Sequence, residues 1–292
     1  MNALSLKGVS KRYGKTRALS GLNLEVPEGV ICGLVGPNGA GKTTTFGIVG
    51  GLIRPDDGFV DVLDSGPFDP AVHRGRVTLL PQDCELHPAT PVRKLLLFFA
   101  RLQGLSASEA QKDVDRVLDA VDLRDRGDAR IRQLSHGMRR RVQVAQAFLG
   151  TPRLVLLDEP ASGLDPEQTA RMRQLFLSTR GTCTLVVSSH ILSELEAVCD
   201  HVAILEGGVC LRAGSMEDIT GSATEVRIRF EGTLPEGLGG TVRDGWLVLQ
   251  GETVAAINAE VLPKLLDAGV GILEVRQGRS LESSYLDRTV EG

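Results

Sequence analysis

The chain has 292 residues, of which 42% are hydrophobic and 24% are charged, and its formal net charge is −4 at pH 7. This length predicts one large domain and one smaller domain, each with a core of its own. The slightly acidic balance argues against nucleic acid or anionic lipid as a partner, and neither a bilayer-spanning apolar run nor a leader pattern is present, so a cytoplasmic chain is expected.

The first predicted elements are strands within residues 4–26, and Tyr13 lies among them. The chain has only two tyrosines. An exposed ring here, just ahead of a glycine-rich loop, could stack on a base. A half-buried strand aromatic is an equally good interpretation of the local sequence.

A glycine-rich segment follows the apolar run of residues 30–35, which predicts a buried strand. The segment has the spacing G-x-x-x-x-G-K-T and consists of Gly36, Pro37, Asn38, Gly39, Ala40, Gly41, Lys42, Thr43 and Thr44. A helix is expected to start at its lysine. Strand, glycine loop and helix together favour a phosphate-binding loop over an ordinary turn. We expect Lys42 to reach the β- and γ-phosphates and Thr43 to offer its hydroxyl to Mg²⁺.

Gln82 comes directly after a strand predicted at residues 76–80, and another strand is expected at 59–63. The end of a strand is where open α/β sheets place groups that bind ligands. Gln82 is therefore a candidate site residue, although one glutamine is weak support by itself.

Residues 92–150 are predicted to be mostly helical. Ser106 and Glu109 form a capping box that opens one helix, and its apolar positions share a face: Ala110, Val114, Val117, Leu118 and Val121. Ser135 is expected to cap the N-terminus of a second helix over residues 139–149, with Gly137 allowing close approach of an anion. The arginines at 139–141 are predicted to be a solvated first turn, although that placement is unfavourable for the helix dipole.

Two adjacent acids, Asp158 and Glu159, follow a continuous apolar run at residues 154–157. Such a run predicts a strand that is buried on both faces. Burying charged acids at the end of such a strand costs free energy, which indicates that they have a function there. The first suits Mg²⁺ and the second suits general-base activation of a water.

A turn at residues 162–165 leads into the next predicted helix, with Asp165 as its N-cap. A further buried strand is expected at 182–187, and His190 lies just beyond its end. A lone histidine is more often structural. This one is expected at the same sheet edge as Gln82 and Asp158, which favours a functional role.

From about residue 222 the pattern changes to three strands, near 226–230, 246–249 and 270–275. Helices are predicted at 252–266, which contains Pro263, and at 281–288. Residues 222–292 are therefore expected to form a small α+β accessory domain without a visible catalytic set. The preceding residues 1–220 form the main domain, with a helical insertion at about 88–150.

Taken together, these segments resemble the ATP-binding subunit of ABC transporters, in particular bacterial drug-resistance exporters. The resemblance covers residues 4–220 through six motifs: Walker A at 36–44, the Q-loop at Gln82, the signature at 134–138, Walker B at 154–159, the D-loop at 162–165 and the switch histidine at 190. It implies an α/β P-loop NTPase with a RecA-like core sheet, an antiparallel β subdomain and a helical insertion. The signature here is Leu-Ser-His-Gly-Met, whereas Leu-Ser-Gly-Gly-Gln is most common in the family.

By this resemblance, the protein is an ATPase that binds ATP and Mg²⁺ and works as a head-to-tail dimer, as a homodimer in the simplest case. Tyr13 would stack on adenine, and Gln82 would join Thr43 and Asp158 at the metal. Glu159, Gln82 and His190 would be catalytic, and Ser135 and Gly137 would contact the nucleotide of the facing subunit. Asp165 would bridge the interface.

The resemblance also implies an integral-membrane permease as partner and a location at the inner face of the cell membrane, with no nucleic acid. Two alternatives stay open. A soluble ABC-type ATPase on ribosomes or DNA would usually carry two cassettes or a long coiled-coil insertion. A GTPase or kinase would lack a use for residues 135–137, and no N-K-x-D motif is present.

Overall fold

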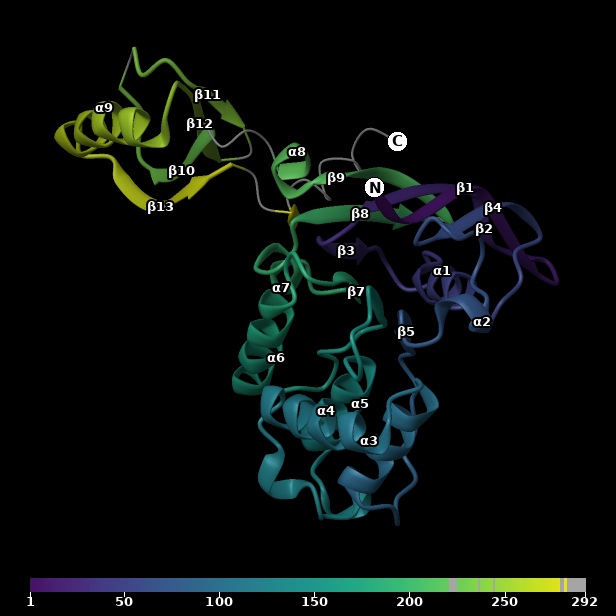
Figure 1. Ribbon diagram of the computed structural model, residues 1–292. Coiled ribbons are helices and arrows are strands. Elements are labelled where there is room, and N and C mark those ends of the chain that lie inside the picture. Colours follow the sequence, from purple (N-terminus) through teal and green to yellow (C-terminus); the bar gives the residue numbers. More distant parts are fainter. Residues whose placement is uncertain (221–224, 236, 244, 279–280, 283–292) are drawn as a thin grey trace. The chain divides into compact units, whose positions relative to one another are not determined.

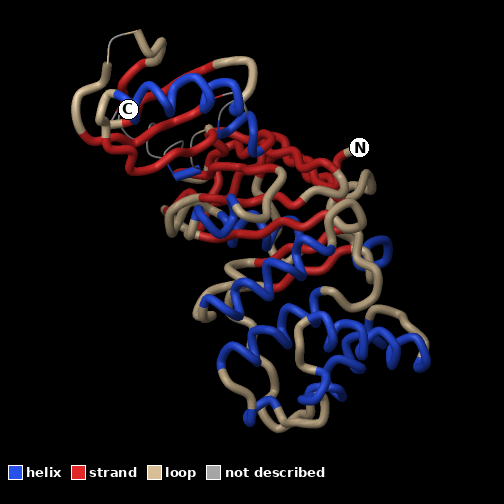
Figure 2. Tube along the Cα trace, turned by 90° about the vertical axis from the view of Figure 1, so that its left-hand side faces the viewer, coloured by secondary structure: helices blue, strands red, loops and turns tan. Residues whose placement is uncertain are grey.

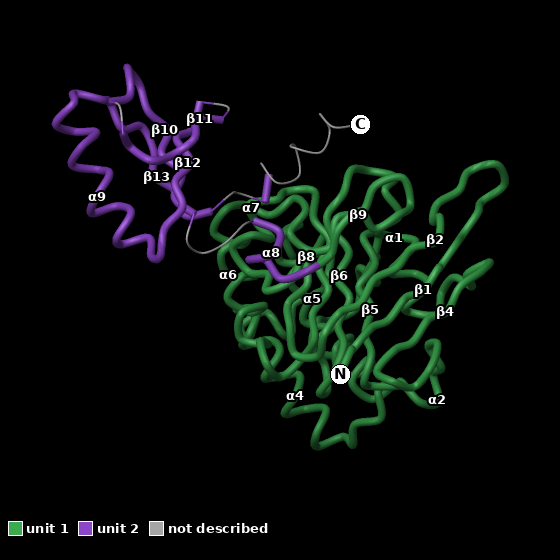
Figure 3. The backbone as a smooth tube through the Cα atoms, turned by 90° about the horizontal axis from the view of Figure 1, so that it is seen from above, with its two compact units in different colours: residues 1–213 green, residues 214–292 purple. Residues whose placement is uncertain are grey.

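The computed structural model describes residues 1–220, 225–235, 237–243, 245–278 and 281–282. They form two compact units, residues 1–213 and 214–292, which are described separately (Figure 3). The helix predicted at 281–288 lies almost entirely outside the described residues.

The first unit contains most of the regular structure. Its elements in chain order are β1 (Asn2–Tyr13), β2 (Thr16–Pro27), β3 (Ile31–Val35), α1 (Lys42–Val49), β4 (Asp57–Val62), α2 (Pro70–His73), β5 (Val77–Leu80), α3 (Val92–Leu102), α4 (Ala107–Ala120), α5 (His136–Ala147), β6 (Leu154–Leu157), α6 (Pro166–Ser178), β7 (Thr184–Ser189), α7 (Leu192–Glu196), β8 (His201–Glu206) and β9 (Val209–Ser215). Short 3-10 turns lie at Arg124–Arg126 and Ile131–Gln133, and β9 crosses the boundary between the units.

A six-stranded sheet with the order β5-β6-β7-β3-β8-β9 forms the centre of this unit (Figures 1 and 2). Strands β5, β6, β7, β3 and β8 run parallel. Every residue of β3, β6 and β7 is buried, which explains why β3 and β6 are apolar runs and why the centre of β7 is apolar. The α/β prediction is thus confirmed. Because parallel strands end at one edge, the segments that follow β3, β5, β6 and β7 meet there.

A second sheet, antiparallel and in the order β2-β1-β4, packs beside the glycine-rich loop. A Cβ placed on Gly41 would lie 2.6 Å from Cδ2 of Leu19 and 2.8 Å from the carbonyl oxygen of Ala18, both on β2. The N–H of Ser20 donates to the carbonyl of Gly208 at 2.8 Å, beside that loop. The antiparallel sheet therefore fixes the wall against which the loop lies.

Helices α3, α4 and α5 form the helical insertion. The capping box is present, with Ser106 Oγ accepting from the N–H of Glu109 at 3.3 Å and the Glu109 carboxylate accepting from the N–H of Ser106 at 2.7 Å. All five predicted apolar positions of this region are buried. The predicted start of α5 at residue 139 was wrong, because Ser135 caps the helix and the helix begins at His136.

The second unit is an α+β arrangement. Its elements are α8 (Met216–Thr220), β10 (Glu225–Glu231), β11 (Thr241–Arg243), β12 (Trp246–Gln250), α9 (Val254–Asp267) and β13 (Gly271–Gln277). The strands form a sheet in the order β11-β12-β10-β13, and Ile257, Val261 and Leu265 of α9 pack on its apolar face. Helix α9 continues through Pro263. In the described part of either unit, no helix combines the length and the apolar character that crossing a membrane requires.

Candidate active site

The glycine-rich loop between β3 and α1 has a backbone that requires glycine. Gly39 has a φ of +83°, and a Cβ on Gly36 would lie 2.3 Å from the carbonyl oxygen of Leu205. Helix α1 starts after Gly41 and has no side-chain cap. Its first N–H groups therefore lack a side-chain acceptor, and an anion at the loop could accept from them.

Lys42 folds back over this loop. Its side chain is 6% exposed, and Nζ donates to the carbonyl oxygens of Gly36 at 2.6 Å and Pro37 at 3.2 Å. A phosphate oxygen carries more negative charge than these carbonyls, so it could take their place as the acceptor of the ammonium. Pro37, Asn38 and Gly39 are exposed at the tip of the loop.

Asp158 sits at the end of β6 and is 1% exposed. Both of its carboxylate oxygens accept a hydroxyl: Oδ2 accepts from Thr43 at 2.7 Å, and Oδ1 accepts from Ser188 at 2.5 Å. These bonds offset the cost of burying the acid. The carboxylate thus lies against the first turn of α1, where Thr43 and Asp158 together offer the oxygen ligands that a magnesium ion prefers.

Glu159 is 7% exposed and has a φ of +50°, in the left-handed region that is strained for any residue other than glycine. Its Oε2 lies 2.8 Å from Nδ1 of His190, the residue after β7. A carboxylate that is held by an imidazole, one residue after the acid that contacts Thr43, can orient and polarise a water molecule. Strained backbone of this kind persists only where the surroundings hold it.

Ser188 links these two acids and was missed by the sequence analysis. Besides donating to Asp158, its Oγ accepts from the N–H of Glu159 at 2.8 Å, and its side chain is fully buried. The available signal was its position at the end of a predicted strand, two residues before His190. A serine in an apolar strand is usually a packing residue, so the pattern did not distinguish it.

Replacing Ser188 with alanine is expected to lower the free energy of unfolding by about 1–3 kcal/mol, because a buried N–H and a buried carboxylate oxygen each lose a partner. Urea denaturation followed by circular dichroism measures the change. The exposed Ser178 serves as the control, since its removal should stay within about 0.5 kcal/mol. Equal values for the two variants would contradict this role of Ser188.

Arg140 corrects the prediction of a solvated first turn in α5. The side chain is 6% exposed and donates to the main-chain carbonyls of Gln82, Asp158, Glu159 and Pro160. Burial lowers the pKa of its guanidinium, and the neighbouring acids oppose that shift. Only Arg139, of the three arginines, is exposed as predicted. The unfavourable position of these arginines relative to the helix dipole indicated that they have an interaction partner. For Arg140, that partner is the main chain of the same subunit.

Gln82 and Tyr13 lie at the margins of this cluster. The Gln82 side chain is exposed, and its main-chain carbonyl accepts from Arg140 at 3.3 Å. Tyr13 is 47% exposed next to the turn between β1 and β2, with Nζ of Lys11 5.8 Å from the ring centroid. Lys11 is held in place by Asp56 at 2.8 Å. The Tyr13 ring is thus accessible to a base, with a positive charge beside it.

Ser135 and Gly137 lie at the start of α5. Their neighbour is the start of α6, and among the residues that the structure describes no hydrogen bond joins them to the cluster of buried acids above. Ser135 is exposed, and its Oγ accepts from the N–H of Met138 at 3.2 Å. A Cβ on Gly137 would lie 1.7 Å from Oε1 of Gln168, so this glycine packs closely against the end of a side chain of α6. The structure therefore places the exposed signature serine beside the turn that starts α6.

Asp165 caps that helix. Its Oδ1 accepts from the N–H of Gln168 at 2.8 Å, and its Oδ2 accepts from the side-chain amide of the same residue. Asp165 is exposed, as is Ser162 earlier in the same turn. The prediction that Asp165 is an N-cap is confirmed.

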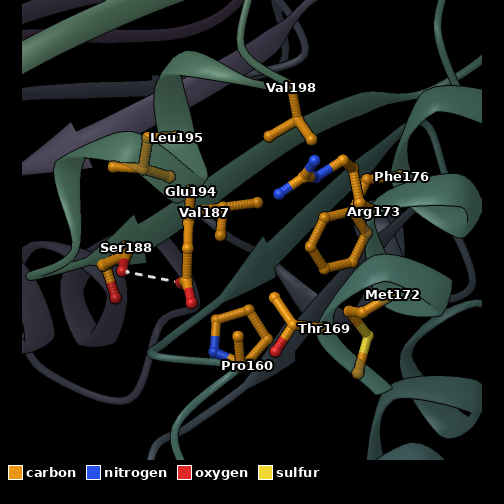
Figure 4. Close-up of a pocket in the computed structure, with 12 residues that line it drawn as sticks. Pro160, Thr169, Met172, Arg173, Phe176, Val187, Ser188, Glu194, Leu195 and Val198 are labelled. Atoms are coloured by element: carbon orange, nitrogen blue, oxygen red, sulfur yellow. Dashed lines mark hydrogen bonds between the residues drawn. The ribbon is translucent and has the colours of Figure 1, made fainter. Parts of the chain in front are cut away.

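A small cavity of about 30 Å³ lies behind the turn that carries Glu159. Pro160 forms part of its wall, Arg173 of α6 and Glu194 of α7 point toward it, and Phe176 and Leu195 supply apolar surface (Figure 4). The volume suffices for about two water molecules and not for a drug-sized ligand. The cavity therefore leaves part of the Pro160 surface without a packing partner.

The comparisons with known proteins point to one family. Residues 19–162 match the family model described as ABC transporter. A Nod factor export ATP-binding protein of Burkholderia orbicola is 38% identical over 215 residues, which are 73% of this chain and 70% of that protein. A daunorubicin resistance ATP-binding protein of Streptomyces coeruleorubidus is 34% identical over 238 residues, 80% of this chain and 75% of that protein.

Among solved structures, an ATP-binding subunit of an ABC transporter superimposes with a TM-score of 0.68 and 25% sequence identity. It covers 89% of this chain and 99% of its own length. The matched residues 19–162 include the glycine loop, Asp158 and Glu159. The match to the family model thus covers most of the side chains that the structure brings together at the ends of β3, β5 and β6.

Proposed function

The chain belongs to the ABC transporter family as an ATP-binding subunit with ATPase activity, and on this premise we propose that it drives a separate integral-membrane permease as a head-to-tail dimer. The names of its relatives, which concern Nod factor export and daunorubicin resistance, support an exporter. The observation that carries the proposal is that Asp158 accepts from Thr43 at the uncapped start of α1, while the next residue, Glu159, contacts His190.

The nucleotide site is proposed to consist of the loop and its neighbours. Lys42 and the N–H groups of the loop would hold the phosphates: Gly36, Pro37, Asn38, Gly39, Ala40, Gly41, Lys42, Thr43 and Thr44 make up the loop. Tyr13 would stack on adenine through its accessible ring.

A magnesium ion fits these residues, because the Thr43 hydroxyl and the Asp158 carboxylate are already 2.7 Å apart. Gln82 would supply a further oxygen from the loop after β5. When bound, the ion would neutralise charge on the phosphates. Asp158 is held for this task by Ser188, which fixes the orientation of its carboxylate.

Glu159 is proposed as the group that polarises the attacking water, and His190 as the group that orients Glu159 and contacts the γ-phosphate. Their contact of 2.8 Å lies one residue beyond Asp158, whose carboxylate meets Thr43 at the start of α1. A carboxylate positioned in this way acts as a general base, and its burial excludes competing water.

The dimer is proposed because the N-terminus of α5 presents Ser135 to solvent in a single subunit. In a head-to-tail pair, Ser135 and Gly137 of one subunit would face the phosphates bound by the other, and Asp165 would lie at the interface. Two helix N-termini would then stabilise one triphosphate. Residues 1–220 would form the ATP-binding domain and residues 222–292 an accessory domain.

The partner and its location are tested by co-purification. We expect a tagged chain, expressed with its neighbouring membrane genes, to be recovered with an integral-membrane protein from the inner face of the cell membrane. Detergent extraction followed by mass spectrometry identifies the partner. Recovery with ribosomes or DNA in its place would contradict the transporter proposal and favour the alternative of a soluble ABC-type ATPase.

Replacing Lys42 with alanine is expected to weaken ATP binding about 10-fold or more, because the ammonium that would pair with the phosphates is lost. Equilibrium titration with a fluorescent ATP analogue measures the dissociation constant. The exposed Lys7 is the control, and its alanine variant should bind as the wild type does. Unchanged binding in Lys42→Ala would remove the loop from the nucleotide site.

A further inference from the structure

Arg140 is a buried cation whose hydrogen bonds are made with uncharged acceptors. A guanidinium has five N–H groups. Nε donates to Pro160 O at 3.0 Å, one terminal nitrogen donates to Gln82 O at 3.3 Å and Gln143 Oε1 at 3.0 Å, and the other donates to Asp158 O at 2.9 Å and Glu159 O at 2.8 Å. Each of the five N–H groups thus has a partner.

Four of these acceptors are main-chain carbonyls that belong to two loops. Three come from consecutive residues, Asp158 to Pro160, in the turn after β6, and the fourth comes from Gln82 after β5. Burying a cation is costly, and an apolar side chain of similar size is often more favourable when only stability matters. A guanidinium is better suited than an ammonium to bind several fixed acceptors, because its donors form a rigid fork.

The turn that Arg140 holds is the one that needs support. Glu159 has a φ of +50°, which costs about 1–3 kcal/mol in a residue with a side chain. Pro160 borders a cavity of about 30 Å³, so part of its surface has no packing partner on that side (Figure 4). Ser188 accepts from the N–H of Glu159. Arg140 donates to the carbonyl of Glu159 and to those of the residues directly before and after it. These two side chains therefore support the left-handed conformation together with the main-chain bond from the N–H of Ser162 to the Glu159 carbonyl at 3.1 Å.

We propose that Arg140 is a positioning residue for hydrolysis, which holds the main chain of the turn so that the Glu159 carboxylate is aimed at the attacking water. Arg140 lies on α5, the helix that begins with the exposed Ser135, and it also binds the loop of Gln82. A displacement at the start of α5 is therefore transmitted through Arg140 to Glu159. This inference rests on the role proposed for Glu159.

The test compares Arg140→Lys with Arg141→Lys. Arg141 is a matched control on the same helix, since it is also largely buried and donates to main-chain carbonyls, those of Val121 at 2.7 Å and Asp122 at 3.2 Å, away from the site. Arg140→Lys is expected to lower kcat about 10-fold or more, because a small misplacement of a reacting group has an effect of this order. ATP binding by equilibrium titration should change less than about twofold. Arg141→Lys should leave kcat unchanged.

The same substitution is then made in the Glu159→Gln background. If Arg140 acts through Glu159, the double variant is no slower than Glu159→Gln alone, since residues that act as a unit are non-additive. An equal fold-loss in both backgrounds, an unchanged kcat in Arg140→Lys, or a parallel loss of ATP binding would overturn the proposal. If Glu159→Gln itself hydrolyses ATP at the normal rate, it is the role of Glu159 that fails.

A second variant covers the case in which Arg140→Lys does not fold. Gln143→Met keeps Arg140 and removes the acceptor of one of its N–H groups, together with the hydrogen bond that the Gln143 amide donates to the carbonyl of Cys84. Gln143→Glu, which keeps an acceptor for Arg140 and loses only the bond to Cys84, is the control. Gln143→Met is expected to lower kcat about threefold with unchanged ATP binding, because one N–H group of the Arg140 guanidinium loses its acceptor and the side chain is held less firmly. A normal kcat in this variant would count against the proposal in the same way.

Discussion

Glu159→Gln is expected to bind ATP with near-normal affinity and to hydrolyse it about 100-fold or more slowly than the wild type. Glutamine keeps the shape of the side chain, and its amide oxygen can still accept from His190, the residue 2.8 Å from the carboxylate. It loses the negative charge that would polarise and deprotonate the attacking water. Steady-state ATPase assays and nucleotide titration separate the two properties.

The same variant should accumulate as an ATP-bound dimer. In the proposed cycle the two subunits close on ATP before hydrolysis, and this variant cannot complete hydrolysis. Size-exclusion chromatography with light scattering, with and without ATP, measures the assembly. The exposed Glu196 provides a control for the substitution, and Glu196→Gln should hydrolyse ATP normally. Wild-type turnover in Glu159→Gln would show that another group activates the water.

Ser135→Arg is expected to abolish hydrolysis while each subunit still binds ATP. The side chain lies exposed at the N-terminus of α5, and an arginine there would occupy the space proposed for the triphosphate of the facing subunit. Loss of the N-cap alone would cost about 1 kcal/mol of stability, which does not explain a loss of activity. Steady-state ATPase assays measure the loss of hydrolysis, and nucleotide titration tests whether ATP is still bound.

Ser106→Arg is the matched control, since Ser106 caps α4 in the same helical insertion. It should show a similar loss of stability and full hydrolysis. A sharper test mixes Ser135→Arg with Lys42→Ala subunits at an ATP concentration that the Lys42→Ala loop does not bind, so that neither variant hydrolyses ATP alone. In a head-to-tail dimer one of the two sites then combines an intact loop with an intact Ser135, so activity should partly return. No recovery in mixed dimers, or full activity in Ser135→Arg alone, would contradict the shared site.

The contrast between α5 and the glycine loop shows how far sequence patterns extend. The loop and the start of α1 were predicted residue by residue, because their conformation is imposed by the glycines and by the flanking strand and helix. The arginines of α5 were assigned to solvent, because a run of three charges usually is solvated. Arg140 is buried only because the turns after β5 and β6 pass beside this helix, which no local pattern encodes.

The sequence by itself determined the α/β class, the glycine-rich loop before α1, the acids at the end of β6 and the N-caps Ser135 and Asp165. Each of these depends on residues adjacent in the chain, whose backbone preferences and apolar periodicity act locally. Only the tertiary structure decided which groups touch. Thr43 meets Asp158 across 115 positions, Ser188 joins the two acids, and Arg140 binds their main chain, because the strand order brings the ends of β3, β5, β6 and β7 to one edge.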